Sequence, residues 1–391
     1  MSAPGAPAPS TASGARPTLE AVAAHAGVSR ATVSRVINGG AGVRAEVRER
    51  VRASVAALGY VPNQAARSLV TRRTGAVAVV IAEPETRVFS DPFFARQLRG
   101  ISRELSRHDT QLLLLLSEGP ADHERIGRYL SGGHVDGALL FSLHGDDPLP
   151  SMTAASGLPT VFGGRPGWAG AEHDPGLLYV DTDNRGGARQ AVAHLLARGR
   201  RRVAVITGPL DMTSALDRLA GYRDALGVAE ADPALVANGD FTAEGGERAM
   251  AELLDRSPDL DAVFAGSDLM ASGALRTLRE RGRRVPEDVA VVGYDDLPPG
   301  AWAEPALTTV RQDVEEMGSI MARLLLRRLG VAGAAHDGGG DADDGRPADA
   351  DGRTEPNERT EPDGRAAGEG GAQAPLAPVV TPARLVVRAS A

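Results

Sequence analysis

The 391-residue chain contains no cysteine and no lysine, and aromatic residues make up only 4% of it. Without cysteine, disulfide bonds and cysteine-ligated metal sites are excluded. Without lysine there is no GxxxxGK phosphate-binding loop, and the GxGxxG, GxSxG and HExxH motifs are absent as well. No apolar run approaches the length of a membrane-spanning helix. We therefore expect no catalytic activity, no cofactor, no metal and no membrane partner.

The first 16 residues, MSAPGAPAPSTASGAR, are rich in alanine, proline, serine and glycine and lack an apolar block. Such a segment cannot bury enough apolar surface to fold, and it does not have the layout of a secretion signal. We interpret residues 1–16 as a disordered leader and expect a cytoplasmic protein.

Residues 18–38, TLEAVAAHAGVSRATVSRVIN, have the apolar spacing of two short helices joined at Gly27. A glycine suits that turn because a residue without a Cβ readily adopts positive φ. Thr18 and Ser29 precede the two helices, where a side-chain oxygen can cap free N–H groups. The second helix has a face of donors and small side chains, formed by Arg30, Ala31, Thr32, Ser34 and Arg35. Such a helix can enter a DNA major groove, although a helical hairpin with a merely solvated face is the alternative.

Residues 43–60 predict a third helix, and three short helices can enclose one small core. The expected inner face of this helix consists of Val47, Val51, Val55 and Leu58. We assign residues 17–62 to a helix-turn-helix headpiece and residues 63–75 to a hinge. The hinge could form one or two helical turns, but only against a partner, because so short a helix is unstable alone.

Charge is distributed unevenly along the chain. Residues 1–75 hold ten arginines against three glutamates, a net of +7, whereas the whole chain has a net charge of −8. A basic module on an otherwise acidic protein is typical of nucleic-acid binders.

From residue 76 onward, short apolar runs alternate with amphipathic helical patterns. The runs predict strands at 76–82, 111–116, 137–142, 159–163, 203–208, 261–266 and 289–294. The helical patterns occur at 92–107, 121–132, 185–198, 213–226, 243–256 and 268–281. This alternation indicates an α/β fold with parallel sheets covered on both faces, and it is too long for one sheet. We therefore expect two subdomains over residues 76–330, with a ligand cleft at the carboxyl ends of the strands.

Residues 331–375 interrupt this pattern with eleven acidic residues, four arginines and ten glycines. We interpret them as a disordered acidic insertion in a surface loop, and a tolerated low-complexity expansion is the simplest explanation. The competing hypothesis is that the insertion mimics phosphates and competes with DNA for the headpiece. Residues 376–391 should return to the core, with a terminal strand over 383–390.

The segment from residue 18 to residue 69 resembles the DNA-binding headpiece and hinge of the lactose-repressor (LacI/GalR) family. The resemblance implies that the second helix reads major-groove bases, that residues 63–69 fold in the minor groove when two protomers pair, and that Leu69 is inserted between base pairs. The DNA-binding residues implied in this way are Thr18, Ser29, Arg30, Ala31, Thr32, Ser34, Arg35, Asn38, Asn63, Gln64, Ala66 and Leu69.

The body is similar to the effector-binding core of the same family, which shares its fold with periplasmic sugar-binding proteins. Segments in family order include DPFFARQLRGI (91–101), RLAGYRDAL (218–226), FAGSDLMASGAL (264–275) and VAVVGYDDL (289–297). The effector-binding residues implied by the resemblance are Phe93, Phe94, Arg218, Phe241, Ser267, Asp268, Asp295 and Gln312. For the aromatic residues core packing is the alternative, and for Asp268 it is a helix N-cap. Ser267 and Gly163 depart from the polar residues that many members carry there, so the ligand can differ from that of familiar relatives.

Alternatives to a regulator remain. Asp181 and Asp183 could bind a metal or act as an acid–base pair, but the resemblance places Asp183 at a strand-to-helix turn as an N-cap. A sugar-binding transport module would explain residues 76 onward but not the headpiece, and an architectural DNA binder would not need a ligand cleft. The sequence therefore predicts a homodimeric repressor that binds a pseudo-palindromic operator under control of a small molecule, a carbohydrate, and that associates with the nucleoid through its operator.

Overall fold

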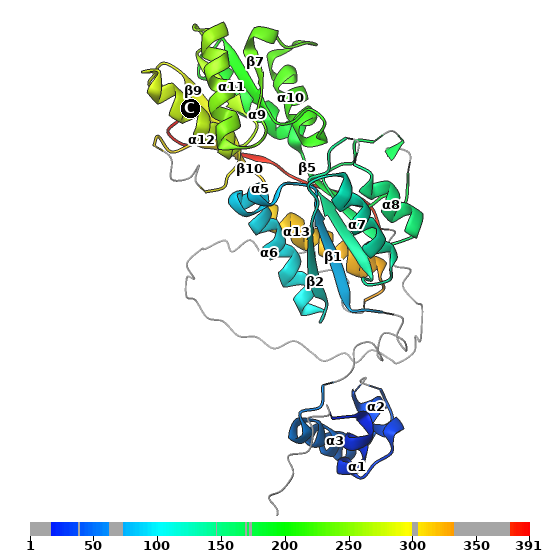
Figure 1. Cartoon of the computed structure of the whole chain (residues 1–391). Helices are drawn as coiled ribbons and strands as arrows, with labels where there is room; N and C mark the ends of the chain where they lie inside the picture. Colours follow the sequence, from blue (N-terminus) through cyan, green and yellow to red (C-terminus); the bar gives the residue numbers. More distant parts are fainter. Residues whose placement is uncertain are drawn as a thin grey trace, which may run out of the picture. The chain divides into compact units, whose positions relative to one another are not determined.

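The structure is a computed structural model, and it describes residues 17–37, 40–61, 73–145, 147–168, 170–171, 174–298, 304–331 and 376–391. The chain divides into two compact units, residues 1–74 and residues 75–391, and each is described by itself (Figure 1). The predicted leader, most of the predicted hinge and nearly all of the predicted insertion lie outside the described residues. Among the helices that are described, none combines the length and apolar character needed to span a bilayer.

The described part of the first unit contains three helices: α1 (Leu19–Ala26), α2 (Arg30–Ile37) and α3 (Ala45–Leu58). Gly27 ends α1 with a φ of 64°, as the turn requires. The Thr18 hydroxyl caps α1 by accepting from the Ala21 N–H, and the Ser29 hydroxyl accepts from the Thr32 N–H at the start of α2. The fully buried side chains of Val22, Val33 and Val51 join the three helices into one core. The predicted headpiece is confirmed in these elements.

The second unit consists of two lobes, each built on a six-stranded sheet. The sheet of the N-terminal lobe has the order β11-β5-β4-β3-β1-β2, and all its pairs are parallel. Its strands are β1 (Ala76–Ile81), β2 (Gln111–Leu116), β3 (Gly137–Phe141), β4 (Thr160–Gly163), β5 (Tyr179–Thr182) and β11 (Val379–Thr381). Its helices are α5 (Glu85–Ser90), α6 (Pro92–Arg107), α7 (Pro120–Ser131), α8 (Leu149–Ser156) and α13 (Val314–Arg328).

The sheet of the C-terminal lobe has the order β12-β10-β9-β8-β6-β7. Its strands are β6 (Val203–Thr207), β7 (Val236–Asn238), β8 (Ala262–Ala265), β9 (Ala290–Asp295), β10 (Thr308–Arg311) and β12 (Arg384–Val386). Its helices are α9 (Asn184–Ala197), α10 (Thr213–Leu226), α11 (Ala243–Arg256) and α12 (Asp268–Glu280). The pairing of β12 with β10 is antiparallel. This sheet is therefore mixed, whereas the sequence predicted a parallel sheet.

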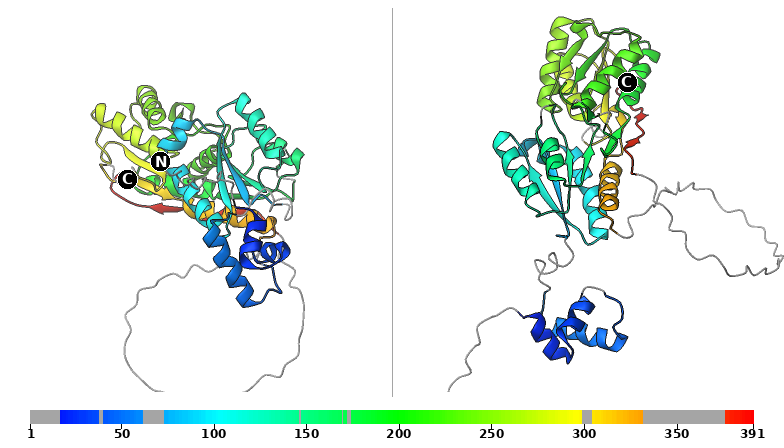
Figure 2. Two further views of the ribbon diagram at one scale, coloured as in Figure 1. Left: turned by 60° about the horizontal axis from the view of Figure 1, so that its bottom comes forward. Right: turned by 90° about the vertical axis from the view of Figure 1, so that its right-hand side faces the viewer.

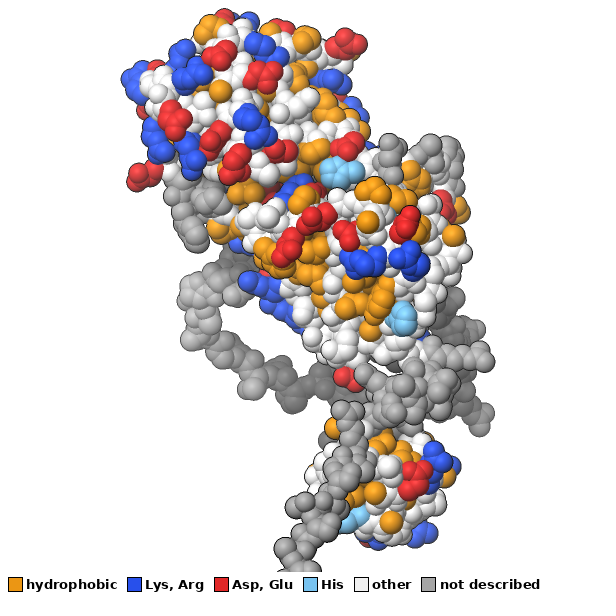
Figure 3. Space-filling model, viewed as in Figure 1, with side chains coloured by type: hydrophobic (Ala, Val, Ile, Leu, Met, Phe, Trp, Pro, Cys, Tyr) orange, Lys and Arg blue, Asp and Glu red, His pale blue; other side chains and the backbone are white. Residues whose placement is uncertain are grey.

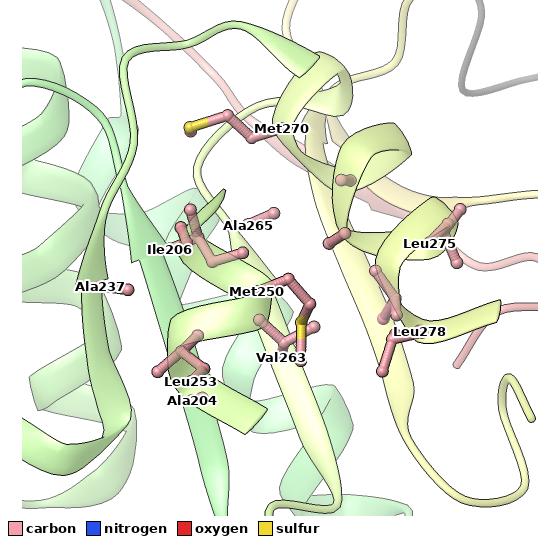
Figure 4. Close-up of a cluster of buried hydrophobic side chains, with 14 of the residues drawn as sticks. Ala204, Ile206, Ala237, Met250, Leu253, Val263, Ala265, Met270, Leu275 and Leu278 are labelled. Carbon is pink, nitrogen blue, oxygen red and sulfur yellow. The ribbon is translucent and has the colours of Figure 1, made fainter. Parts of the chain in front are cut away.

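Each sheet is covered by helices on both faces, which explains why its central strands are mainly apolar (Figure 2). In the C-terminal lobe, Met250 and Leu253 of α11 pack with Leu278 of α12 on one face, as Figure 4 shows. The opposite face is covered by α9 and α10, with Val192 and Tyr222 in the core. In the N-terminal lobe, α5, α6 and α13 cover one face of the sheet, and α7 and α8 cover the other.

In the described residues the chain passes between the lobes three times: from β5 to α9, from β10 to α13, and from β11 to β12. The predicted terminal strand over 383–390 is therefore wrong in extent. Residues 376–391 hold two short strands, one in each sheet, because two residues after Thr381 are enough to carry the chain across. Figure 1 shows this segment in red where it runs from one lobe to the other.

Candidate functional site

A cavity of about 100 Å³ lies between the two lobes of the second unit, and we call it the inner cavity. The carboxyl ends of β3, β4 and β9 reach it, together with the N-terminal turns of α6 and α9. This is the position at which ligands bind in parallel α/β sheets.

The side of the inner cavity formed by the C-terminal lobe is built around Asp295, the last residue of β9. Its Oδ1 accepts a hydrogen bond from Gln312 Nε2 at 2.5 Å and lies 3.7 Å from Arg218 Nη1. Burial raises the pKa of Asp295 to about 7, although Arg218 opposes that rise and Asp91 of the other lobe adds to it. The site therefore holds a carboxylate that titrates near neutral pH, in contact with a guanidinium.

Arg218 is buried in the second turn of α10. Its Nε donates to Asn184 Oδ1 at 2.9 Å, and its Nη1 donates to the carbonyl of Gly266 at 2.5 Å. The ring of Tyr294 lies 3.7 Å from the guanidinium carbon. These contacts fix the plane of the guanidinium, so its orientation is set before a ligand arrives.

The N-terminal lobe contributes Asp91, which caps α6 by accepting from the Phe93 N–H at 2.9 Å. Phe94 follows on α6 and is only 1% exposed, yet it lines the inner cavity. Two buried atoms of this wall, Arg87 Nε and Gln97 Oε1, have no hydrogen-bond partner among the residues that the structure describes. A buried donor and a buried acceptor without partners are costly, and a ligand with hydroxyl groups can satisfy both.

Aromatic and cationic groups of opposite lobes meet across the inner cavity. The Phe241 ring of the C-terminal lobe lies 5.4 Å from the guanidinium carbon of Arg87 and 5.8 Å from that of Arg218. Phe241 has a φ of 63°, a conformation that non-glycine residues adopt mainly where function or packing imposes it.

Seven of the eight predicted effector-binding residues line the inner cavity: Phe93, Phe94, Arg218, Phe241, Ser267, Asp295 and Gln312. Asp268 does not, because its carboxylate accepts hydrogen bonds from the Leu297 N–H at 2.9 Å and from Thr309 Oγ1 at 2.5 Å. Nor is it the N-cap of α12, since that position belongs to Ser267, whose hydroxyl accepts from the Met270 N–H.

The predicted effector contacts did not include several residues that line the inner cavity: Arg87, Asp91, Gln97, Phe141, Ser142, Asp181, Asn184, Met212, Ser214 and Met317. Asp91 could have been found, because it stands directly before the proline and two phenylalanines of DPFF. Asp183 caps α9 by accepting from the Gly186 N–H at 2.8 Å, as the resemblance implied. The described residues include no cluster of three or more side chains able to hold a metal ion.

In the first unit, Thr18, Ser29, Arg30, Ala31 and Arg35 are exposed. Thr32 and Ser34 are half-buried on the same helix. Arg30 forms an exposed ion pair with Glu20 at 3.1 Å, and the hydroxyls of Ser29 and Thr32 lie 2.9 Å apart. The predicted DNA contacts at Asn38, Asn63, Gln64, Ala66 and Leu69 lie outside the described residues. Within the described residues, α2 thus presents an exposed face that carries Arg30 and Arg35.

Comparisons with known proteins agree with both units. The family model for bacterial regulatory proteins of the lacI family matches residues 18–63, and one for a periplasmic binding protein-like domain matches residues 192–339. The HTH-type transcriptional regulator CelR of Thermobifida fusca is 54% identical over 316 residues, which cover 80% of this chain and 92% of that protein. The chain belongs to the lacI family.

Other lacI family members support the same assignment. The ribose operon repressor of Escherichia coli (strain K12) is 35% identical over 317 residues, covering 80% of this chain and 93% of that protein. A solved structure of a CelR–cellobiose complex has 46% identity and a TM-score of 0.68, covering 96% of this chain and all of that one. The Lac repressor dimer bound to operator and the anti-inducer ONPF has 25% identity and a TM-score of 0.74, covering 96% and 99%. The predicted DNA-binding transcriptional regulator is confirmed by this membership.

Proposed function

We propose that the chain is a homodimeric repressor whose affinity for a pseudo-palindromic operator is controlled by a carbohydrate bound in the inner cavity. In the cell, operator binding holds the protein at the nucleoid.

The observation that carries the effector proposal is the mixed chemistry of the inner cavity. A sugar ring has apolar C–H faces and a rim of hydroxyl groups that both donate and accept. Phe94 and Phe241 supply faces for the ring, while Asp295 and Arg218 supply a paired acceptor and donor. Arg87 Nε and Gln97 Oε1 add a donor and an acceptor without partners. The cellobiose complex of the CelR structure supports a carbohydrate in particular.

The DNA proposal rests on the first unit. Two copies of α2 would enter successive major grooves with Arg30, Ala31 and Thr32 toward base edges, and Ser29, Ser34 and Arg35 toward bases and phosphates. The N-cap Thr18 and Asn38 would contact the backbone nearby. The hinge residues would meet in the minor groove, where Leu69 acts as an apolar wedge beside Asn63, Gln64 and Ala66. The operator-bound Lac repressor dimer supports this arrangement.

Control of DNA binding follows from ligand contacts that come from both lobes. Arg87 and Gln97 belong to the N-terminal lobe, whereas Arg218 and Asp295 belong to the C-terminal lobe. A ligand held by both sets favours one angle between the lobes over another, because it gains contacts only where both sets reach it. The three chain segments between the lobes permit such a rotation, which would change the spacing of the two hinges in a dimer.

A surface suited to dimerisation lies on the N-terminal lobe. β2 is the outermost strand of its sheet, and Leu112 and Leu114 on it form a groove with Leu98 of α6. These leucines are only partly buried, and the space-filling view shows hydrophobic side chains gathered on this lobe (Figure 3). A second copy would cover an apolar edge strand that otherwise invites aggregation.

The test joins calorimetry to operator binding, with cellobiose as the first probe. Saturating cellobiose should change the operator dissociation constant at least tenfold, and Arg218→Ala should remove the change. For the operator-binding measurement, the DNA is selected from genomic fragments that the protein retains. A chain that retains no fragment at low ionic strength would contradict the DNA proposal. A panel of mono- and disaccharides without a single binder would contradict the effector proposal.

A further inference from the structure

A second cavity of about 60 Å³ adjoins the inner cavity, and we call it the outer cavity. The two cavities share five lining residues: Ser142, Gly163, Gly164, Met212 and Ser214. They are therefore two compartments in series along the boundary between the lobes. The function proposed above uses only the first compartment.

Gly164 stands at the junction of the two compartments, since it lines both of them. Gly164 follows β4 with a φ of 95°, and a Cβ built on it would meet no atom within 4 Å. The missing side chain therefore leaves free space at the junction of the two cavities. Any other residue would be strained at that φ and would project into the space.

The outer cavity repeats the chemistry of the inner one. Trp168 provides an aromatic wall, and the Phe162 ring supports it edge-on at 5.2 Å between centroids. The polar wall includes His144, whose Nδ1 lies 2.8 Å from Asp211 Oδ2 of the other lobe. Hydrogen bonding to Glu83 raises the pKa of His144 to about 9, so this imidazole is positively charged at neutral pH.

Arg165 completes the polar wall of the outer cavity and reaches across to the C-terminal lobe. Both Asp217 carboxylate oxygens accept from its Nη2 at 2.8 Å, and its carbonyl accepts from Thr213 Oγ1 at 2.6 Å. The outer cavity is thus bounded by an aromatic face and by charged groups that link the lobes. An apolar face beside fixed charged groups suits a sugar ring and not a purely apolar group.

We propose that the outer cavity binds the second ring of a disaccharide whose first ring occupies the inner cavity, with the Trp168 indole as its stacking face. This inference rests on the proposed carbohydrate effector. It makes the outer cavity the determinant of ligand length: a monosaccharide fills one compartment, whereas a disaccharide passes Gly164 and fills both.

The fluorescence of Trp168 can report directly on ligand binding in the outer cavity. The chain has two tryptophans, Trp168 and Trp302, so the Trp302→Phe variant leaves Trp168 as the single indole emitter. Saturation of this variant with cellobiose, followed in parallel by calorimetry, should shift or quench the emission. Cellobiose binding that is visible by calorimetry but leaves the emission spectrum unchanged would overturn the proposal.

Affinity measurements provide a second test of the outer cavity as a sugar subsite. Calorimetry with glucose, ribose, cellobiose and maltose should find a disaccharide that binds at least tenfold more tightly than glucose, equivalent to about 1.4 kcal/mol. Trp168→Ala should reduce that preference at least tenfold, and Trp168→Phe should restore most of it. Tyr129→Ala removes an aromatic of the same lobe that lines neither cavity, and it should leave the preference unaltered.

The outcomes separate this proposal from the one it rests on. If glucose binds as tightly as every disaccharide, or if Trp168→Ala keeps the full preference, the outer cavity is not a sugar subsite, although the effector proposal stands. If none of the four sugars binds, the carbohydrate effector itself fails, and the subsite fails with it. Circular dichroism and thermal midpoints of each variant verify that the fold is intact.

Discussion

Effector binding should tighten by about tenfold between pH 6 and pH 8, because Asp295 titrates in this range. Burial raises the pKa of Asp295 to about 7, so the carboxyl is roughly 10% ionised at pH 6 and roughly 90% at pH 8. Ligand hydroxyls donate to the ionised form, which Gln312 and Arg218 also favour through Oδ1. A ligand that binds only the ionised form should therefore bind about tenfold more tightly at pH 8 than at pH 6, or by about 1.4 kcal/mol, because the ionised fraction rises by that factor.

The assay is isothermal calorimetry with cellobiose at half-unit steps of pH and constant ionic strength. Asp295→Asn should weaken binding and flatten the profile, since the amide does not titrate. Asp255→Asn makes the same isosteric change at an exposed carboxylate paired with Arg281, and its profile should match that of the wild type. A wild-type profile that is flat from pH 6 to pH 8, or one that rises toward acid, would refute the reasoning.

The same pKa shift affects stability with a defined sign. The folded-state pKa of Asp295 lies above the value near 3.9 of an unfolded chain, so the folded state keeps a proton that the unfolded state loses. Stability from this group is complete below the unfolded pKa and is lost as the pH rises through about 7. Asp295→Asn should remove this loss, which makes the melting temperature less dependent on pH between 4 and 7.

The remaining predictions concern the headpiece, the hinge, the effector contact and the core. Arg35→Ala should weaken operator binding and lower the salt slope by about one, and an unchanged slope would argue against a phosphate contact. Leu69→Ala should lower operator affinity while the melting curve stays as it is; a duplex bent as strongly as before would dismiss the wedge. Arg218→Ala should abolish the effector response but retain operator binding, and a responsive variant would remove this residue from the site. Gly100→Ala should destabilise the core unit by about 1–3 kcal/mol in urea unfolding, because its Cβ would lie 1.9 Å from the Glu315 carbonyl oxygen; an unaltered midpoint would show that α6 and α13 can separate freely.

The strands and helices that the sequence predicted are those with strong local signals. Buried parallel strands such as β1 and β9 are continuous apolar runs, and each predicted one is present within a residue or two. The missed strands β5, β7, β10 and β11 have three or four residues each and end in polar residues, so they stand out less than the equally short but more apolar β8. α13 is different, because its apolar spacing and its Asp313 cap were readable and were overlooked.

A residue of the site could be predicted from the sequence where it stands directly at the end of a recognisable strand. Asp295 directly follows an apolar run, so its place at the cleft could be anticipated. Gln97 and Asn184 were not predictable, because their positions depend on the approach of two lobes whose segments are far apart in sequence. Asp268 shows the converse: Gly293 leaves space for its carboxylate, which turns inward to β10 and away from the inner cavity.

The pair of short strands at 379–386 has a consequence for biosynthesis. β11 and β12 are edge strands of separate sheets, and both begin more than 300 positions after the start of β1. The N-terminal lobe can complete its sheet only after residue 381 has been translated, and the C-terminal lobe only after residue 386. Both sheets are therefore completed at nearly the same late stage of synthesis. One short segment, residues 379–386, thus supplies the last strand of both sheets, so the folding of the two lobes is completed together.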